Sequence, residues 1–126
     1  MVQAVSTPGE LAVRYLQAWN ESDPQRRRAL VAEVLSDDAS YVDPLAEVAG
    51  HEGLCALIGG MQAKFAGARF SLKGTPEGHH DRIRFSWTLA VDGKKLAEGT
   101  DVALLAPDGR LEAVTGFLDY VDPGLA

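Results

Sequence analysis

The chain has 126 residues, of which 46% are hydrophobic and 24% charged, and its formal net charge is -6. This length accommodates one domain, residues 1–126, and the acidic balance argues against nucleic acid as a partner, because a groove that follows phosphates needs basic residues. A single cysteine excludes an internal disulfide and a cysteine-based zinc site.

Three local features have ordinary explanations. Cys55 lies among apolar residues at helical spacing, so we expect it to fill a small buried space. Residues 26–28 are consecutive arginines and fit a solvated helix face better than an anion site. Residues 1–5 lack the charged and long apolar regions of a signal peptide, and no apolar run approaches the roughly 20 residues that span a membrane. We therefore expect a cytoplasmic protein without a membrane partner.

The first predicted helix begins at residues 7–10, which form a capping box with proline at the first helical position. Leu11, Tyr15 and Trp19 follow at intervals of four, so a phenol and an indole share its apolar face. Residues 20–24 are expected to end this helix and to cap the second. The buried side of the second helix is expected to consist of Leu30, Val31, Val34 and Leu35.

Residues 37–44, DDASYVDP, are predicted to end the second helix and to form a short strand from Ser40 to Asp43. Pro44 forces Asp43 out of the helical region and cannot continue a ladder, so Asp43 should lie where the chain leaves the sheet. A carboxylate that is half buried yet reachable there is a candidate catalytic base. The alternative is that Asp43 caps its own backbone in an Asx-type turn.

A third helix is predicted to begin near His51. Gly59 and Gly60 interrupt its apolar pattern, and each costs about 1 kcal/mol in a helix relative to alanine. Close packing of another backbone, or room for a ligand, would compensate for them. The buried side of this helix is expected to be Leu54, Leu57, Ile58, Met61 and Phe65.

The rest of the sequence predicts antiparallel strands. Phe70 and Leu72 alternate with polar residues, and residues 82–91 alternate over a full strand. Turns at residues 92–93 and 107–109 link this strand to two more, at about 95–105 and 110–119. The order of elements predicts an α+β domain in which three N-terminal helices pack on one face of a strongly curved, mainly antiparallel sheet.

Three motifs resemble the nuclear transport factor 2-like superfamily, in its SnoaL-like and ketosteroid-isomerase-like branch. They are residues 14–15 (Arg-Tyr), residues 37–44, and residues 100–102 (Thr-Asp-Val) followed by 108–110 (Asp-Gly-Arg). The resemblance covers roughly residues 10–119 and implies a cone with an internal pocket. This fold hosts isomerases, cyclases, epoxide hydrolases, dehydratases and non-catalytic binding modules.

In ketosteroid isomerases, a helix-borne phenol and a protonated aspartic acid hold the enolate oxygen, while an aspartate before a proline moves the proton. By position, the resemblance assigns these roles to Tyr15, Asp101 and Asp43. Asp101 can donate only when protonated, which requires an apolar wall. The shorter hairpin before Asp101 leaves open a bulge that turns it outwards. For Tyr15 the alternative is a helix-face aromatic whose hydroxyl has a backbone partner. The strand neighbours expected to form the wall are Ala97, Gly99, Ala103 and Leu105.

Further side chains are expected to bind a ligand, although the aromatic ones have plain core as an alternative role. His79 and His80 point to opposite sides of a strand, so at most one of them can face the pocket. No third ligand lies at helical or hairpin spacing from them, so we expect no metal. The expected ligand-binding residues are Trp19, Tyr41, Met61, Phe85, Trp87, Phe117 and His80.

Two functions remain open. The first is a cofactor-independent proton-transfer enzyme, of isomerase or cyclase type, acting on a small-to-medium apolar carbonyl compound that the resemblance makes steroid- or polyketide-like. The second is a non-catalytic small-ligand-binding or dimerisation module of the same fold. Epoxide hydrolysis would instead use Arg84, Asp101 and Asp119. The resemblance also implies a homodimer through the outer face of the sheet.

Overall fold

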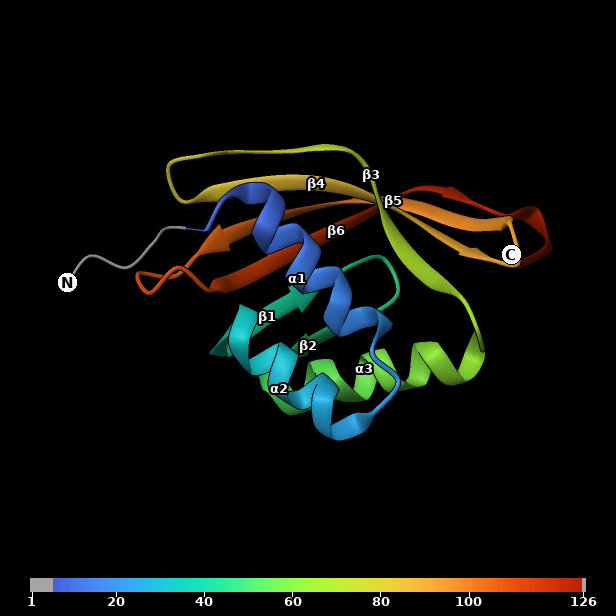
Figure 1. Ribbon diagram of the computed structural model, residues 1–126, viewed down its shortest axis with the longest axis horizontal. Helices are drawn as coiled ribbons and strands as arrows, with labels where there is room; N and C mark the ends of the chain where they lie inside the picture. Colours follow the sequence, from blue (N-terminus) through green and yellow to red (C-terminus); the bar gives the residue numbers. More distant parts are fainter. Residues whose placement is uncertain (1–5, 126) are drawn as a thin grey trace.

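Three helices pack on one face of a strongly curved, six-stranded sheet in the computed structural model, which describes residues 6–125 (Figure 1). The predicted α+β class is confirmed, and the prediction made for residues 1–5 lies outside the described residues. The elements are α1 (Pro8–Asn20), α2 (Pro24–Val34), β1 (Leu35–Val42), β2 (Glu47–Ala49), α3 (Gly50–Lys64), β3 (Arg69–His79), β4 (Arg82–Val91), β5 (Lys94–Leu105), β6 (Leu111–Val121) and the 3-10 helix η1 (Pro123–Leu125).

The strands are arranged in the order β2-β1-β6-β5-β4-β3. Strands β4 to β6 form the three predicted hairpin-linked antiparallel strands, β3 adds a fourth antiparallel strand beside β4, and β2 pairs antiparallel with β1. Strand β1 pairs parallel with β6, so the first long strand of the chain lies beside the last. α1 packs against β3 and β4, while α3 packs against β1 and β2 (Figure 1). The helices therefore cover the concave side of the sheet at both of its edges, α1 at the β3–β4 edge and α3 at the β1–β2 edge.

Helix α1 begins and ends at well-defined polar contacts. The capping box is present: the Thr7 hydroxyl accepts from the backbone N–H of Glu10 at 3.1 Å, and the Glu10 carboxylate accepts from the N–H of Thr7 at 3.0 Å. At the other end, the Asn20 amide donates to the carbonyl of Phe70 and accepts from its N–H, at 2.9 and 2.7 Å. These two bonds attach the end of α1 to β3, next to the contact between the Trp19 and Phe70 rings.

The boundary between the second helix and the first strand differs from the prediction. Helix α2 ends at Val34, and β1 begins at Leu35, which was assigned to the helix. Leu35 pairs with Leu111 of β6, and its carbonyl accepts from the Arg110 guanidinium at 3.2 Å. Tertiary pairing thus overrides the helical spacing. Strand β2 was not predicted either, because its three residues form a strand only by pairing with the end of β1.

The arginine run is not a uniformly solvated face. Arg26 and Arg28 are exposed, but the Arg27 side chain is only 8% exposed. Its guanidinium donates to the carbonyls of Glu21 and Ser22, at 3.0 and 3.3 Å, and to the side-chain oxygen of Gln62 at 2.8 Å. Arg27 therefore connects α2 to α3 and to the turn before α2.

This arginine also explains one of the helix glycines. A Cβ atom on Gly59 would lie 3.1 Å from Nη1 of Arg27, so the missing side chain makes room for a guanidinium rather than for a backbone or a ligand. Gly60 has no atom within 4 Å of such a Cβ. Cys55, expected to be buried, is half-buried against the core. Among the described residues, no helix combines the length and apolar character needed to cross a membrane.

Candidate functional site

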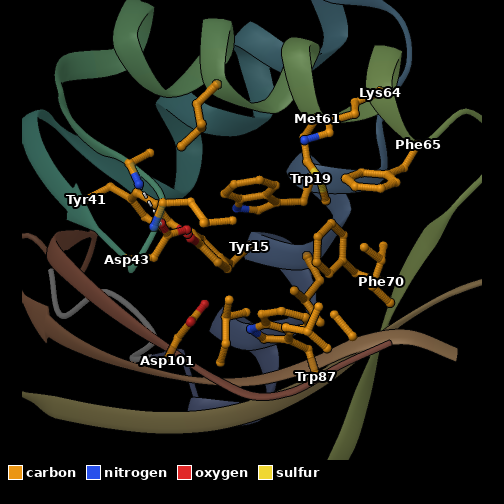
Figure 2. Close-up of a pocket in the computed structure, with 18 of the residues that line it drawn as sticks. Tyr15, Trp19, Tyr41, Asp43, Met61, Lys64, Phe65, Phe70, Trp87 and Asp101 are labelled. Atoms are coloured by element: carbon orange, nitrogen blue, oxygen red, sulfur yellow. Dashed lines mark hydrogen bonds between the residues drawn. The ribbon is translucent and has the colours of Figure 1, made fainter. Parts of the chain in front are cut away.

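A cavity of about 400 Å³ lies between the helices and the concave side of the sheet (Figure 2). Its wall is mainly apolar and draws on α1, α3, β1, the turn after β1, β3, β4, β5, β6 and η1. Leu45, which is 84% exposed, Val121 and Leu125 mark where it opens to solvent. The lining residues are Tyr15, Leu16, Trp19, Tyr41, Asp43, Leu45, Ala46, Leu57, Met61, Lys64, Phe65, Phe70, Trp87, Leu89, Ala97, Asp101, Leu118, Val121 and Leu125.

Asp43 follows the end of β1 and lines this cavity. Its Oδ1 accepts from the backbone N–H groups of Leu45 and Ala46, at 2.7 and 2.8 Å, so the Asx-type turn is present. Its Oδ2 accepts from the Tyr41 hydroxyl at 2.5 Å (Figure 2). Each carboxylate oxygen has two lone pairs, so one acceptor position remains, on Oδ2. Asp43 is thus both a turn residue and a cavity residue, and the two alternatives are compatible.

Tyr41 was expected in the pocket, but its bond to Asp43 was not foreseen. Residues two apart on a strand point to the same face, and this spacing was the available signal. Burial, followed by the hydrogen bond to Asp43, raises the pKa of the Tyr41 phenol above its usual value. Tyr41 therefore stays protonated and holds the carboxylate in place.

Asp101 points into the cavity, and its side chain is only 4% exposed. Burial raises the pKa of its carboxyl from 3.8 to about 7; the nearby charge of Asp43 also raises this pKa, while the Trp87 indole lowers it. The pairing of this strand is irregular at three places: between Leu89 and Ala90 of β4, and between Glu98 and Gly99 and between Leu104 and Leu105 of β5. The alternative in which a bulge turns Asp101 outwards is therefore not the one that the structure shows. The neighbours expected beside it, Ala97, Gly99 and Ala103, are buried as well.

Gly116 on β6 is the point at which these groups meet. A Cβ atom there would lie 2.8 Å from Oδ1 of Asp101, 3.3 Å from Cβ of Asp43 and 3.7 Å from the Tyr41 oxygen. The three side chains therefore surround one backbone position, which must lack a side chain. Sequence reasoning missed Gly116, since a lone glycine in a strand pattern does not reveal what approaches it.

Helix α1 supplies two buried donors that have no partner within residues 6–125, the Tyr15 hydroxyl and the Trp19 indole N–H. Tyr15 is 1% exposed and Trp19 7%, and both line the cavity. The backbone partner considered for Tyr15 is absent among the described residues. Burial, followed by the charge of Asp101, raises the pKa of the Tyr15 phenol well above its usual value, while the neighbouring Trp19 indole lowers it. The Tyr15 hydroxyl therefore stays protonated and is able to donate to a ligand.

Of the seven expected ligand-binding residues, Trp19, Tyr41, Met61 and Trp87 lie in the cavity wall. Phe85 does not, because it packs behind Tyr15 with ring centroids 5.5 Å apart. Phe117 does not line the cavity either. Its neighbour Gly116 faces inwards, so strand alternation turns Phe117 to the outer face, where it is 56% exposed.

The two histidines lie away from the cavity, so the expected ligand-binding residue His80 is not in its wall. His79 and His80 are both exposed, and His80 occupies the β3–β4 turn with φ 52°. It borders a separate, more polar hollow beside Arg14 and Arg110. Neither histidine reaches the cavity. Within residues 6–125, His, Cys, Asp and Glu side chains form no group of three that could hold a metal ion.

The arrangement considered for epoxide hydrolysis does not form. Arg84 is exposed and pairs with Glu77, and Asp119 accepts from the Thr100 hydroxyl at 2.7 Å on the outer side of the sheet. Only Asp101 lies in the cavity. The three groups therefore cannot act on one water molecule.

Ala97 lines the cavity as expected, but eleven other lining residues were not foreseen as pocket residues. Leu16, Leu57, Phe65, Phe70 and Leu89 fit the apolar patterns of helices and strands, and in this fold the core and the cavity share them. Residues 45–46 and 125 belong to a turn and to η1, and their approach to the cavity has no local sequence signal. Lys64 stands directly before Phe65, the last residue of the predicted apolar face of the third helix, and it lines the cavity too.

Comparison with known proteins gives a consistent picture. The SnoaL-like domain family matches residues 12–114. A SnoaL-like family protein from Agrobacterium tumefaciens str. C58, which has been suggested to be an isomerase, is 48% identical over 87% of this chain and 95% of its own, with a TM-score of 0.84. No curated protein matches the chain.

Two more distant structures bear on the fold alone. A SnoaL-like protein of unknown function from Burkholderia thailandensis E264 is 13% identical, covers 90% of this chain and 95% of its own, and has a TM-score of 0.72. A protein from Jannaschia sp. CCS1, suggested to be a SnoaL-like polyketide cyclase, is 16% identical, covers 94% and 92%, and has a TM-score of 0.67.

Proposed function

Because the chain belongs to the SnoaL-like domain family, we propose that it is a cofactor-independent proton-transfer enzyme, of isomerase or cyclase type, acting on an apolar carbonyl compound in the cavity. One observation carries this proposal. An otherwise apolar cavity holds a carboxylate with one free acceptor position, a carboxyl whose pKa is raised to about 7 by burial, and a buried phenol without a partner among the described residues.

The proposed chemistry assigns a step to each group. Oδ2 of Asp43 takes a proton from the carbon next to the substrate carbonyl, and the electron pair of that C–H bond moves to give an enolate. The Tyr15 hydroxyl and the protonated Asp101 carboxyl donate to the enolate oxygen, where an apolar surrounding strengthens both contacts. Asp43 then returns the proton to the same or another carbon, which gives exchange or isomerisation.

Tyr41 is the proposed positioning residue for Asp43. Its hydroxyl and the N–H groups of residues 45 and 46 hold three of the four acceptor positions of the carboxylate. They direct the remaining position towards a substrate, and preorganisation of this kind is where much of an enzyme's rate comes from.

Proton exchange in deuterated buffer tests the proposal, with a panel of enolisable apolar ketones that includes a β,γ-unsaturated ketosteroid. Asp43→Asn keeps the oxygen that accepts in the Asx-type turn but removes the base, so we expect exchange to fall by at least about 100-fold. Asp119→Asn, on the outer face, is the matched control and should leave the rate unchanged. Exchange that is equal in wild type and Asp43→Asn would contradict the role of Asp43.

A non-catalytic ligand-binding module is the second candidate. The observation that favours it is that the backbone of its own turn already holds one oxygen of Asp43. This candidate predicts saturable binding of an apolar ketone, measured by the fluorescence of Trp19 and Trp87, with no exchange above buffer for any compound in the panel. Exchange catalysed by wild type would exclude it.

A further inference from the structure

Charge is distributed unevenly around the cavity. The two acidic lining residues, Asp43 and Asp101, are close together beside Gly116. Lys64, the last residue of α3, is the only basic residue among the described residues that line the cavity. Figure 2 shows it on the α3 side, beyond Trp19 and away from Asp101. Rings and aliphatic side chains fill the wall between, so the cavity has an acidic end, an apolar middle and a cationic end.

Lys64 differs from the other lysines of the chain in having no carboxylate partner among the described residues. Lys73 and Lys95 pair with Glu98, at 3.2 and 3.4 Å, and Lys94 pairs with Asp122 at 3.6 Å. The ammonium of Lys64 instead lies 5.5 Å from the centroid of the Phe65 ring. In a chain with a net charge of -6, the lysine without a carboxylate is therefore the one at the cavity.

The physical chemistry of this position favours an anion. A lysine stem can lie along apolar surface while its ammonium stays near water. A ligand that fills the apolar middle removes water from one side of that ammonium, which strengthens its attraction to a negative group on the ligand. The acidic end cannot accept such a group, because the charge of Asp43 would repel it.

We propose that Lys64 binds an anionic group of the ligand, so that the substrate is amphipathic: an apolar body with a carboxylate, sulfate or similar anion at the Lys64 end. That the opposite end of this molecule carries the reacting carbonyl rests on the proposed function. The anion preference itself rests only on the cavity and its charges.

Two fluorescent probes with the same apolar framework test this preference. 1-Anilinonaphthalene-8-sulfonate carries one sulfonate, and N-phenyl-1-naphthylamine lacks it. We expect wild type to bind the sulfonate probe more tightly. Lys64→Met should weaken binding of that probe about fivefold, the size of one partly exposed ion pair, and leave the neutral probe within about twofold. Lys64→Arg should restore the preference.

The control is Lys94→Met, which removes an exposed lysine that does not line the cavity, and it should change neither dissociation constant. A purely structural role for Lys64, such as the favourable charge at the end of α3, would alter both probes alike. Equal changes for the two probes, an equal loss in Lys94→Met, or no saturable binding of the sulfonate probe to wild type would each overturn the proposal.

The probe-binding experiment tests Lys64 independently of the proton-exchange assay, which tests Asp43. A preserved anion preference without proton exchange would remove the enzymatic function and leave Lys64 as part of a binding pocket. Proton exchange that depends on Asp43 without an anion preference would leave the enzyme and remove the amphipathic substrate.

Discussion

The space around Gly116 does not fit even one additional carbon atom without a shift of its neighbours. A methyl group at this position would lie 2.8 Å from a carboxyl oxygen of Asp101, closer than Cβ atoms come to other atoms, so Asp101 or its neighbours would have to move. Displacement of a reacting group by about 1 Å can cost about 100-fold in rate. We therefore expect Gly116→Ala to fold but to lose about 10- to 100-fold in exchange rate.

Gly60→Ala is the matched control, because a Cβ there has no atom within 4 Å. It should keep the exchange rate and raise the free energy of unfolding by about 1 kcal/mol, since alanine is the better helix former. If Gly116→Ala exchanged protons as fast as wild type, the positions of Asp101 and Asp43 relative to β6 would not matter for the reaction.

Asp101 also gives the molecule a defined response to pH. Between 3.8 and about 7 the folded state holds a proton on Asp101 that the unfolded chain has released, so the free energy of unfolding should fall by a few kcal/mol as the pH rises through this window and level off above it. Asp101→Asn should remove this part of the slope. Chemical denaturation of both proteins at several values between pH 4 and pH 8 measures it, and parallel curves would contradict the raised pKa.

At the scale of elements, Arg27 joins α2 to α3. Removing its guanidinium leaves the Ser22 carbonyl and the Gln62 side chain without this donor and opens a space beside Gly59. We expect Arg27→Ala to lower the free energy of unfolding by about 2–3 kcal/mol. Arg28→Ala, at an exposed neighbouring position, should change it by less than about 0.5 kcal/mol. Urea denaturation compares the two, and equal effects would show that the buried contacts of Arg27 contribute nothing.

Elements with their own local signals could be predicted from the sequence. The capping box fixed the start of α1, and strict alternation fixed β4. Elements that exist only through their partners could not: Leu35 becomes strand by pairing with Leu111, and β2 needs the end of β1 beside it. The burial of Arg27 was missed for the same reason, because its acceptors lie on other elements.

In the candidate site, too, some residues could be predicted from the sequence and others depended on the tertiary structure. The positions of Tyr15, Asp43 and Asp101 were expected from the resemblance, and all three line one cavity. Phe117 and His80 were placed wrongly, because the side to which a strand or turn residue points depends on register and backbone that spacing does not reveal. Lys64 was missed, since nothing local distinguishes a lysine at a cavity from one in solvent.

At the scale of the whole molecule, the helices cover one side of the sheet and leave the other side open. Phe117 and Val102 are exposed on that outer side, among polar residues such as Thr100 and Asp119. The homodimer expected through this surface stays a prediction. If a partner covers it, the cavity is unaffected, because the lining faces the helices instead.

The parallel pairing of β1 with β6 has a consequence for biosynthesis. Tyr41 and Asp43 belong to the first half of the chain, but the backbone position that they surround together with Asp101 is Gly116, near its end. A nascent chain emerging from the ribosome can form α1 and α2 early, yet the site remains unassembled until residues 111–121 have left the exit tunnel. A stalled or truncated product that ends before β6 would expose the apolar face of its helices, and it is this incomplete chain that would need a chaperone.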